Sequence, residues 1–159
     1  MLLEMKKSSA DDITIFADIT DHKFNGSTIP PDIISTKSRP DLVIVNRKAK
    51  KIELLELTCS FETNIEQANN KKYRRYLSLK SDLESEGWTV YLTPFEIGSR
   101  GHVTNRNKTA LKNTFIRNHI KLNHKKLFCD LSKISLLCSF SIFQAHCEPA
   151  WRDPPLLHP

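Results

Sequence analysis

Residues 39–76 read RPDLVIVNRKAKKIELLELTCSFETNIEQANNKKYRRY, and this stretch decides the fold of the chain. Two apolar runs, LVIV and IELLELTC, are joined by the basic turn NRKAKK and followed by a helical pattern. Each of the three segments carries one polar side chain that packing alone does not explain. These are Asp41 at the head of the first run, Glu56 inside the second and Lys72 in the helix. We interpret them as a candidate site.

Strand periodicity predicts that the two carboxylates lie close together. Successive side chains of a strand point to opposite faces, so Asp41 shares a face with Val45, and Glu56 shares one with Ile52. If the two runs pair as a hairpin with Val45 opposite Ile52, the same register places Asp41 opposite Glu56.

A single helix is predicted from about Glu62 or Asn64 to Glu86, with Thr63 or Asn64 as its N-cap and Gly87 as its stop signal. Its apolar stripe, at steps of three and four residues, consists of Ile65, Ala68 or Asn69, Lys72, Tyr76, Leu79 and Leu83. Lys72 therefore lies on the buried side, where its ammonium must reach water or pair with carboxylates.

The other segments complete an α/β pattern. Ile13 to Thr20 is predicted as a strand, and residues 21–38 as a loop because two consecutive prolines remove backbone donors. A strand over residues 88–97 is expected to run parallel to the strand of Glu56 after a right-handed crossover. A basic helix over 105–123 and an apolar helix over 130–146 follow, the second packing on the core. Residues 1–12 are predicted to be frayed, and Trp151 in the irregular tail to lie against the body.

The chain of 159 residues fits one domain, residues 1–159. No window approaches eighteen uninterrupted apolar residues, and the start is too short and too charged for a signal peptide, so we expect no membrane contact and an intracellular location. The cysteines lack zinc spacing and are predicted to be reduced thiols packed in or near the core. They are Cys59, Cys129, Cys138 and Cys147.

The net charge of +6 is distributed unevenly. Basic residues gather in the turn over 46–51, again over 71–75, and from Arg100 to Lys126. Each cluster can be a solvated surface, but three clusters around one acidic pair favour a nucleic-acid partner. Two adjacent carboxylates suit Mg²⁺ or Mn²⁺, and a nearby ammonium suits the charge that develops during phosphodiester hydrolysis.

This pattern resembles the PD-(D/E)XK nuclease superfamily and, more narrowly, the restriction-like endonuclease domains of site-specific non-LTR retrotransposons. The resemblance rests on RPD, on ELT fifteen residues later, and on KKYRRY in the following helix. The superfamily usually has a lysine where this chain has Thr58. Some members carry that lysine on the next helix, four residues before a tyrosine, and Lys72 and Tyr76 match that arrangement.

The resemblance covers roughly residues 13–115, leaving 116–159 as a C-terminal helical extension with an irregular tail. It implies an α/β, restriction-endonuclease-like core with a central mixed four-stranded sheet flanked by helices. It also implies a DNA endonuclease that uses Mg²⁺ or Mn²⁺, is derived from a mobile element, acts in the nucleus, and is fused to or associated with a reverse transcriptase.

The same resemblance assigns roles to individual residues. The metal ligands would be Asp41, Glu56 and the backbone carbonyl of Leu57. Lys72 would be the catalytic ammonium, supported by Tyr76. A further acidic partner is sought among Glu96, Asp18 and Asp32, and the candidate phosphate contacts are Arg39, Ser99 and Arg100. The turn Gly98 to Gly101 either directs backbone donors at a phosphate or is a plain strand-to-helix connection.

Two other interpretations stay open. The chain can be a nuclease-like domain without activity that only binds nucleic acid, because Thr58 stands where the lysine is usual. Alternatively, Lys72 and Glu56 form an ion pair that merely fixes the helix to the sheet.

Overall fold

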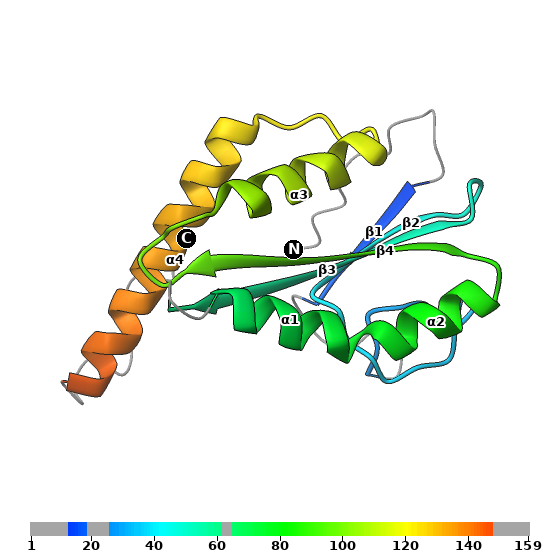
Figure 1. The fold of residues 1–159 in the computed structure, drawn as a ribbon, viewed down its shortest axis with the longest axis horizontal. Helices are drawn as coiled ribbons and strands as arrows, with labels where there is room; N and C mark the ends of the chain where they lie inside the picture. Colours follow the sequence, from blue (N-terminus) through cyan, green and yellow to red (C-terminus); the bar gives the residue numbers. More distant parts are fainter. Residues whose placement is uncertain (1–12, 19–25, 62–64, 148–159) are drawn as a thin grey trace.

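The computed structural model describes residues 13–18, 26–61 and 65–147, and its centre is one mixed four-stranded β-sheet (Figure 1). The strands are β1 (Ile13–Ala17), β2 (Leu42–Asn46), β3 (Lys51–Ser60) and β4 (Thr89–Gly98), in that spatial order. The first three are antiparallel to their neighbours, whereas β3 and β4 are parallel. The α/β class with a mixed four-stranded sheet flanked by helices is therefore confirmed.

The predicted hairpin register is also confirmed. Val45 lies opposite Ile52, and the pairing continues to Leu42 opposite Leu55. Beyond that pair β2 has not yet begun, so within the described residues the last part of β3 has only β4 as a strand partner. The edge of β3 next to the candidate site is consequently open to side chains from the segment before β2.

Two helices cover one face of the sheet and two cover the other (Figure 1). α1 (Ile65–Arg75) and α2 (Leu77–Ser85) lie over the first face, where Val43, Leu54 and Leu83 belong to one buried cluster. α3 (Asn105–Arg117) and the start of α4 (His124–Cys147) lie over the second, where Ile44 and Phe128 belong to another. Burial on both faces explains why β3 reads as an almost continuous apolar run.

The prediction of one helix up to Glu86 was wrong, because the helix is interrupted at Tyr76. This residue has φ −102° and ψ 6°, and its N–H donates to the carbonyl of Tyr73 three residues earlier. The buried stripe nevertheless continues across the break through Tyr76, Leu79 and Leu83. Gly87 ends α2 as predicted, with φ +80°.

The bounds predicted for the last two helices were also wrong. α3 ends at Arg117 because Asn118 and His119 leave helical geometry, His119 with φ +53°. α4 begins at His124 and not at residue 130. The predicted strand up to Thr20 ends at Ala17, while β4 and the start of α3 at Asn105 agree with expectation.

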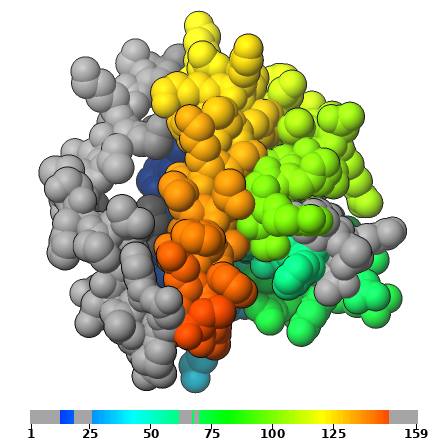
Figure 2. All heavy atoms as spheres, turned by 90° about the vertical axis from the view of Figure 1, so that its left-hand side faces the viewer, coloured from blue at the N-terminus to red at the C-terminus, as the bar shows by residue number. Residues whose placement is uncertain are grey.

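The expectation that the last helix packs on the core holds only for its first half. Phe128 and Ser135 are buried in α4, whereas six large apolar side chains from residue 134 onward are exposed. They are Ile134, Leu136, Leu137, Phe140, Ile142 and Phe143. Figure 2 shows α4, in orange, running along the surface. By length and apolar composition α4 can span a membrane, a property that the helices of many soluble proteins share.

The four cysteines are free, but the prediction that they are packed in or near the core was wrong, because all four are exposed. Other predictions fall outside the described residues. These are the frayed start, the caps Thr63 and Asn64, the position of Trp151, and the side chains of Ile65, Ala68 and Asn69.

Candidate functional site

Asp41 lies at the end of β3 where the strand has lost its partner β2. Its Oδ2 accepts a hydrogen bond of 2.7 Å from the backbone N–H of Leu57. In a strand, the N–H and C=O of one residue point to the same edge. The carbonyl of Leu57 therefore lies on the edge that Asp41 reaches, while the Leu57 side chain is exposed on the opposite face of the sheet.

Glu56 is buried beneath α1, with only 1% of its side chain exposed, and pairs with Lys72. The Nζ of Lys72 lies 2.6 Å from Oε2 of Glu56, and 23% of the lysine side chain is exposed. Lys72 belongs to the last turn of α1, so it spans the gap between helix and sheet. The inward orientation that the helical stripe predicted is thus present.

Tyr76 closes the site at the break between α1 and α2. Its hydroxyl lies 3.1 Å from the carbonyl oxygen of Arg39 and within hydrogen-bonding reach of Glu56. Burial raises the pKa of this phenol well above its ordinary value of 10, and the hydrogen bond with Glu56 and the negative charges of Glu56 and Asp41 raise it further. Tyr76 is therefore a neutral hydrogen-bond donor, and the carbonyl of Arg39 accepts its proton.

Glu96 lies on the same face of the sheet, because its register partner is Thr58, two residues after Glu56. Its side chain is fully buried, and its backbone carbonyl accepts a hydrogen bond of 2.8 Å from Asn107. Thr58 and Ser60 share this face, and the described residues offer no hydrogen-bond partner to their buried hydroxyl oxygens. The structure thus adds buried polar groups beside Glu56.

The candidate phosphate contacts are largely engaged within the chain. The guanidinium of Arg39 pairs with both oxygens of Asp18, at 2.8 and 3.0 Å. The N–H groups of Gly98, Ser99 and Gly101 donate to backbone carbonyls, at 2.7, 2.8 and 2.7 Å. They therefore serve the strand-to-helix connection. Arg100 is exposed in this turn, and Asp32, the other weak acidic candidate, pairs with Arg47 at 2.8 Å on the surface.

The carboxylates of Asp41 and Glu56 fit a hard divalent cation better than zinc. Both offer only oxygen donors, and the carbonyl of Leu57 lies on the edge that Asp41 reaches. In the described part of the chain no three His, Cys, Asp or Glu side chains gather to hold a metal ion. Mg²⁺ commonly binds to one or two carboxylates, with water and substrate phosphate as its remaining ligands. The residues present therefore fit Mg²⁺ or Mn²⁺.

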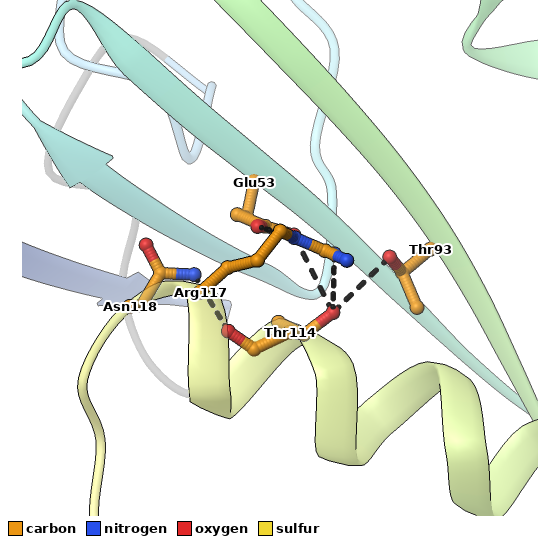
Figure 3. Close-up of polar contacts among 5 residues, drawn as sticks. All are labelled: Glu53, Thr93, Thr114, Arg117 and Asn118. Carbon is orange, nitrogen blue, oxygen red and sulfur yellow. Dashed lines mark hydrogen bonds and ion pairs between the residues drawn. The ribbon is translucent and has the colours of Figure 1, made fainter.

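A third buried carboxylate, Glu53, was missed in the sequence (Figure 3). It is fully buried on the opposite face and forms a bidentate pair with Arg117, at 2.7 and 2.9 Å. The hydroxyl of Thr114 lies 3.1 Å from the same guanidinium and 3.3 Å from the hydroxyl of Thr93. The ring of Tyr91 lies 4.6 Å from Arg117. Because Glu53 has these partners, we assign it to anchoring α3.

No family model matches the chain, and comparison with curated proteins found no match. A functional interpretation consequently rests on the residues and geometry of the site.

Proposed function

We propose that the chain is a metal-dependent DNA endonuclease. The observation that carries the proposal is the contact of 2.6 Å between Lys72 and Glu56, next to Leu57, whose backbone N–H donates to the Asp41 carboxylate. A surface pair would hold two solvated side chains, but this pair holds a carboxylate that is 1% exposed beneath a partly exposed ammonium. Such an arrangement leaves the lysine accessible to a ligand while its position is fixed.

The residues have complementary roles in hydrolysis. Asp41, Glu56 and the Leu57 carbonyl would hold Mg²⁺ or Mn²⁺, which when bound lowers the pKa of a coordinated water and neutralises phosphate charge. Lys72 would orient the attacking water and stabilise the negative charge on the phosphorus oxygens. As the water oxygen attacks phosphorus, one P–O ester bond breaks, and the leaving oxygen takes up a proton. Tyr76 would support the site by donating its hydroxyl proton to the Arg39 carbonyl, which positions the segment that carries Asp41.

Relaxation of supercoiled plasmid tests the proposal. The wild-type chain is expected to nick plasmid in Mg²⁺ or Mn²⁺ and to stop when EDTA is added. Asp41→Asn should abolish nicking, because the amide keeps an oxygen for Leu57 but loses the negative charge that a cation requires.

Asp32→Asn is a matched control, because Asp32 is a surface acid with 63% of its side chain exposed. It should nick at the wild-type rate. Absence of nicking by the wild-type chain, or equal nicking by wild type and Asp41→Asn, overturns the proposed function.

A binding domain without activity is the second candidate, and Thr58 favours it. This residue stands where the superfamily usually has its lysine, and its hydroxyl has no hydrogen-bond partner among the described residues. Thermal unfolding in Mn²⁺ separates the candidates, because a cation that binds only the folded state raises the melting temperature. The endonuclease predicts a rise for the wild type and none for Asp41→Asn. The binding domain predicts no rise in either, with salt-sensitive DNA binding retained.

A further inference from the structure

A basic cavity of about 720 Å³ lies between α3 and α4, on the sheet face opposite the candidate site. We call it the α3–α4 pocket. The side chains that give it its character are His102, Lys108, Lys112, His124, Lys125 and Phe128. None of the described residues that line it is acidic. Figure 2 views the side of the molecule where α3 and α4 adjoin. The lining therefore carries three ammonium groups without a carboxylate.

The positive charge comes from three structural sources. Lys108 and Lys112 are four residues apart, so they project from one face of α3. Lys125 comes from the first turn of α4. The N-terminus of α3 also opens on the pocket through Thr104 and Asn105, and the N-terminal end of a helix carries partial positive charge.

The described residues do not neutralise this charge. Among the described residues, no carboxylate forms an ion pair with Lys108, Lys112 or Lys125. The neighbouring Lys126, in contrast, pairs with Asp130 at 2.7 Å. The Nδ1 atom of His124 is buried without a hydrogen-bond partner among the described residues, although the ring stacks on Phe115. Like charges and an unsatisfied polar atom in one cavity both cost free energy. A bound anion would offset the repulsion between the like charges.

We propose that the α3–α4 pocket binds phosphate groups of a nucleic-acid backbone. Ammonium groups and a helix N-terminus are the groups that recognise phosphate. The volume is that of pockets that hold whole small molecules, which is more than a single ion requires. Phe128 is almost entirely buried and lies beneath Lys112, so it offers no open ring for base stacking. The net charge of +6 agrees with a polyanionic ligand.

Fluorescence anisotropy with a short labelled single-stranded oligonucleotide tests this proposal. EDTA is present throughout, so the result does not depend on metal binding or cleavage and a failure is separable from failure of the proposed function. Lys108→Gln and Lys125→Gln should each weaken binding several-fold. The double variant should lower the slope of log K against log salt by about 1.4, since each phosphate that a lysine neutralises on a single strand contributes about 0.7.

Lys126→Gln is the matched control, since it removes the same charge one residue from Lys125 but outside the pocket. It should bind the oligonucleotide almost as tightly as the wild type. If Lys125→Gln and Lys126→Gln weaken oligonucleotide binding equally, the proposal is overturned, because binding then depends on the overall positive charge and not on the pocket.

Two competitors distinguish other sources of the same chemistry. The first is pyrophosphate. If Lys108→Gln weakens the binding of pyrophosphate but leaves oligonucleotide binding unchanged, the nucleic-acid assignment is overturned. The second is vesicles of phosphatidylcholine and phosphatidylserine. If Lys108→Gln weakens vesicle binding but leaves oligonucleotide binding unchanged, the ligand is a lipid surface and the nucleic-acid assignment is overturned.

Discussion

At the scale of single residues, the site depends on a buried carboxylate that needs its partner. Glu56 is almost entirely shielded from water, and Lys72 is the cation placed against it. Removing one member of a buried pair leaves an uncompensated charge, whereas replacing both members by apolar groups is often neutral. The energetic role of the pair can thus be measured separately from any catalytic role.

Lys72→Met is expected to lower the free energy of unfolding by about 2 kcal/mol, because Glu56 stays buried without its cation. This value is below the ~3–5 kcal/mol typical of fully buried pairs, since 23% of the Lys72 side chain is exposed to water. Urea denaturation of the wild type, Lys72→Met and the double variant Glu56→Met/Lys72→Met provides the measurement. The double variant should regain most of the loss. A single variant as stable as the wild type would show that the pair is not formed.

Tyr76 is expected to ionise above the ordinary phenol pKa of 10, because burial and the nearby carboxylates disfavour the phenolate. Its contribution to stability is complete below pH 10. The contribution falls as pH rises through the folded-state pKa, since the unfolded chain loses its proton first. Absorbance titration of phenolate in the wild type and Tyr76→Phe isolates this transition as a difference curve. A difference curve with its midpoint at or below pH 10 would be incompatible with the buried hydroxyl.

The contact between Lys72 and Glu56 could be predicted from the sequence, because helical spacing turns the lysine toward the sheet face that carries Glu56. Strand alternation predicted Asp41 beside Glu56, and the structure places the Asp41 carboxylate on the backbone N–H of the next residue, Leu57. Glu53 could not be assigned in the same way. It sits in the same apolar run on the other face, and only the position of Arg117, more than sixty residues later, shows that it is paired.

At the scale of elements, Gly101 controls how closely the strand-to-helix turn approaches α4. The residue has φ +82°, and a Cβ there would lie 2.6 Å from the carbonyl oxygen of Ser132. Gly87 has a similar φ of +80°, but a Cβ there would meet no atom within 4 Å. Substitution of Gly87 therefore measures the cost of the backbone conformation alone, whereas substitution of Gly101 adds the cost of a steric clash.

Gly87→Ala should lower the free energy of unfolding by about 1 kcal/mol, the cost of positive φ for a residue with a side chain. Gly101→Ala should cost clearly more, because the Ser132 carbonyl belongs to a helix backbone and cannot rotate away. Thermal denaturation of the two variants measures the difference. If both variants lose the same free energy of unfolding, α4 can move away from the turn without loss of stability.

The strands and their pairing were predictable, whereas several helix ends were not. The hairpin register followed from joining the two runs through the turn NRKAKK with Val45 opposite Ile52, since loop length sets the register of a hairpin. The break at Tyr76 and the end of α3 at Asn118 carry no glycine or proline. At Asn118 the side-chain amide bonds to the carbonyl of Thr114, at 2.8 Å, and His119 takes a positive φ. Such ends depend on tertiary packing more than on local sequence.

At the scale of the whole molecule, the sheet separates two regions of different chemistry. The face beneath α1 holds the acidic site with Lys72, and the opposite face holds the Glu53 anchor and the basic α3–α4 pocket. The far half of α4 extends past the sheet (Figure 1). Its apolar composition predicted a packed core helix, but composition does not reveal that the sheet ends before the helix does.

The rate of plasmid nicking by Lys72→Gln, compared with Lys71→Gln, tests the proposed endonuclease site most directly. Both substitutions remove one positive charge from α1, but Lys71 is exposed and Lys72 contacts Glu56. Lys72→Gln should slow nicking by about 100-fold or more, the typical contribution of a positioned catalytic group. Lys71→Gln should remain near the wild-type rate. Equal rates for the two variants, with both folded, would contradict the assignment of Lys72 to the chemistry.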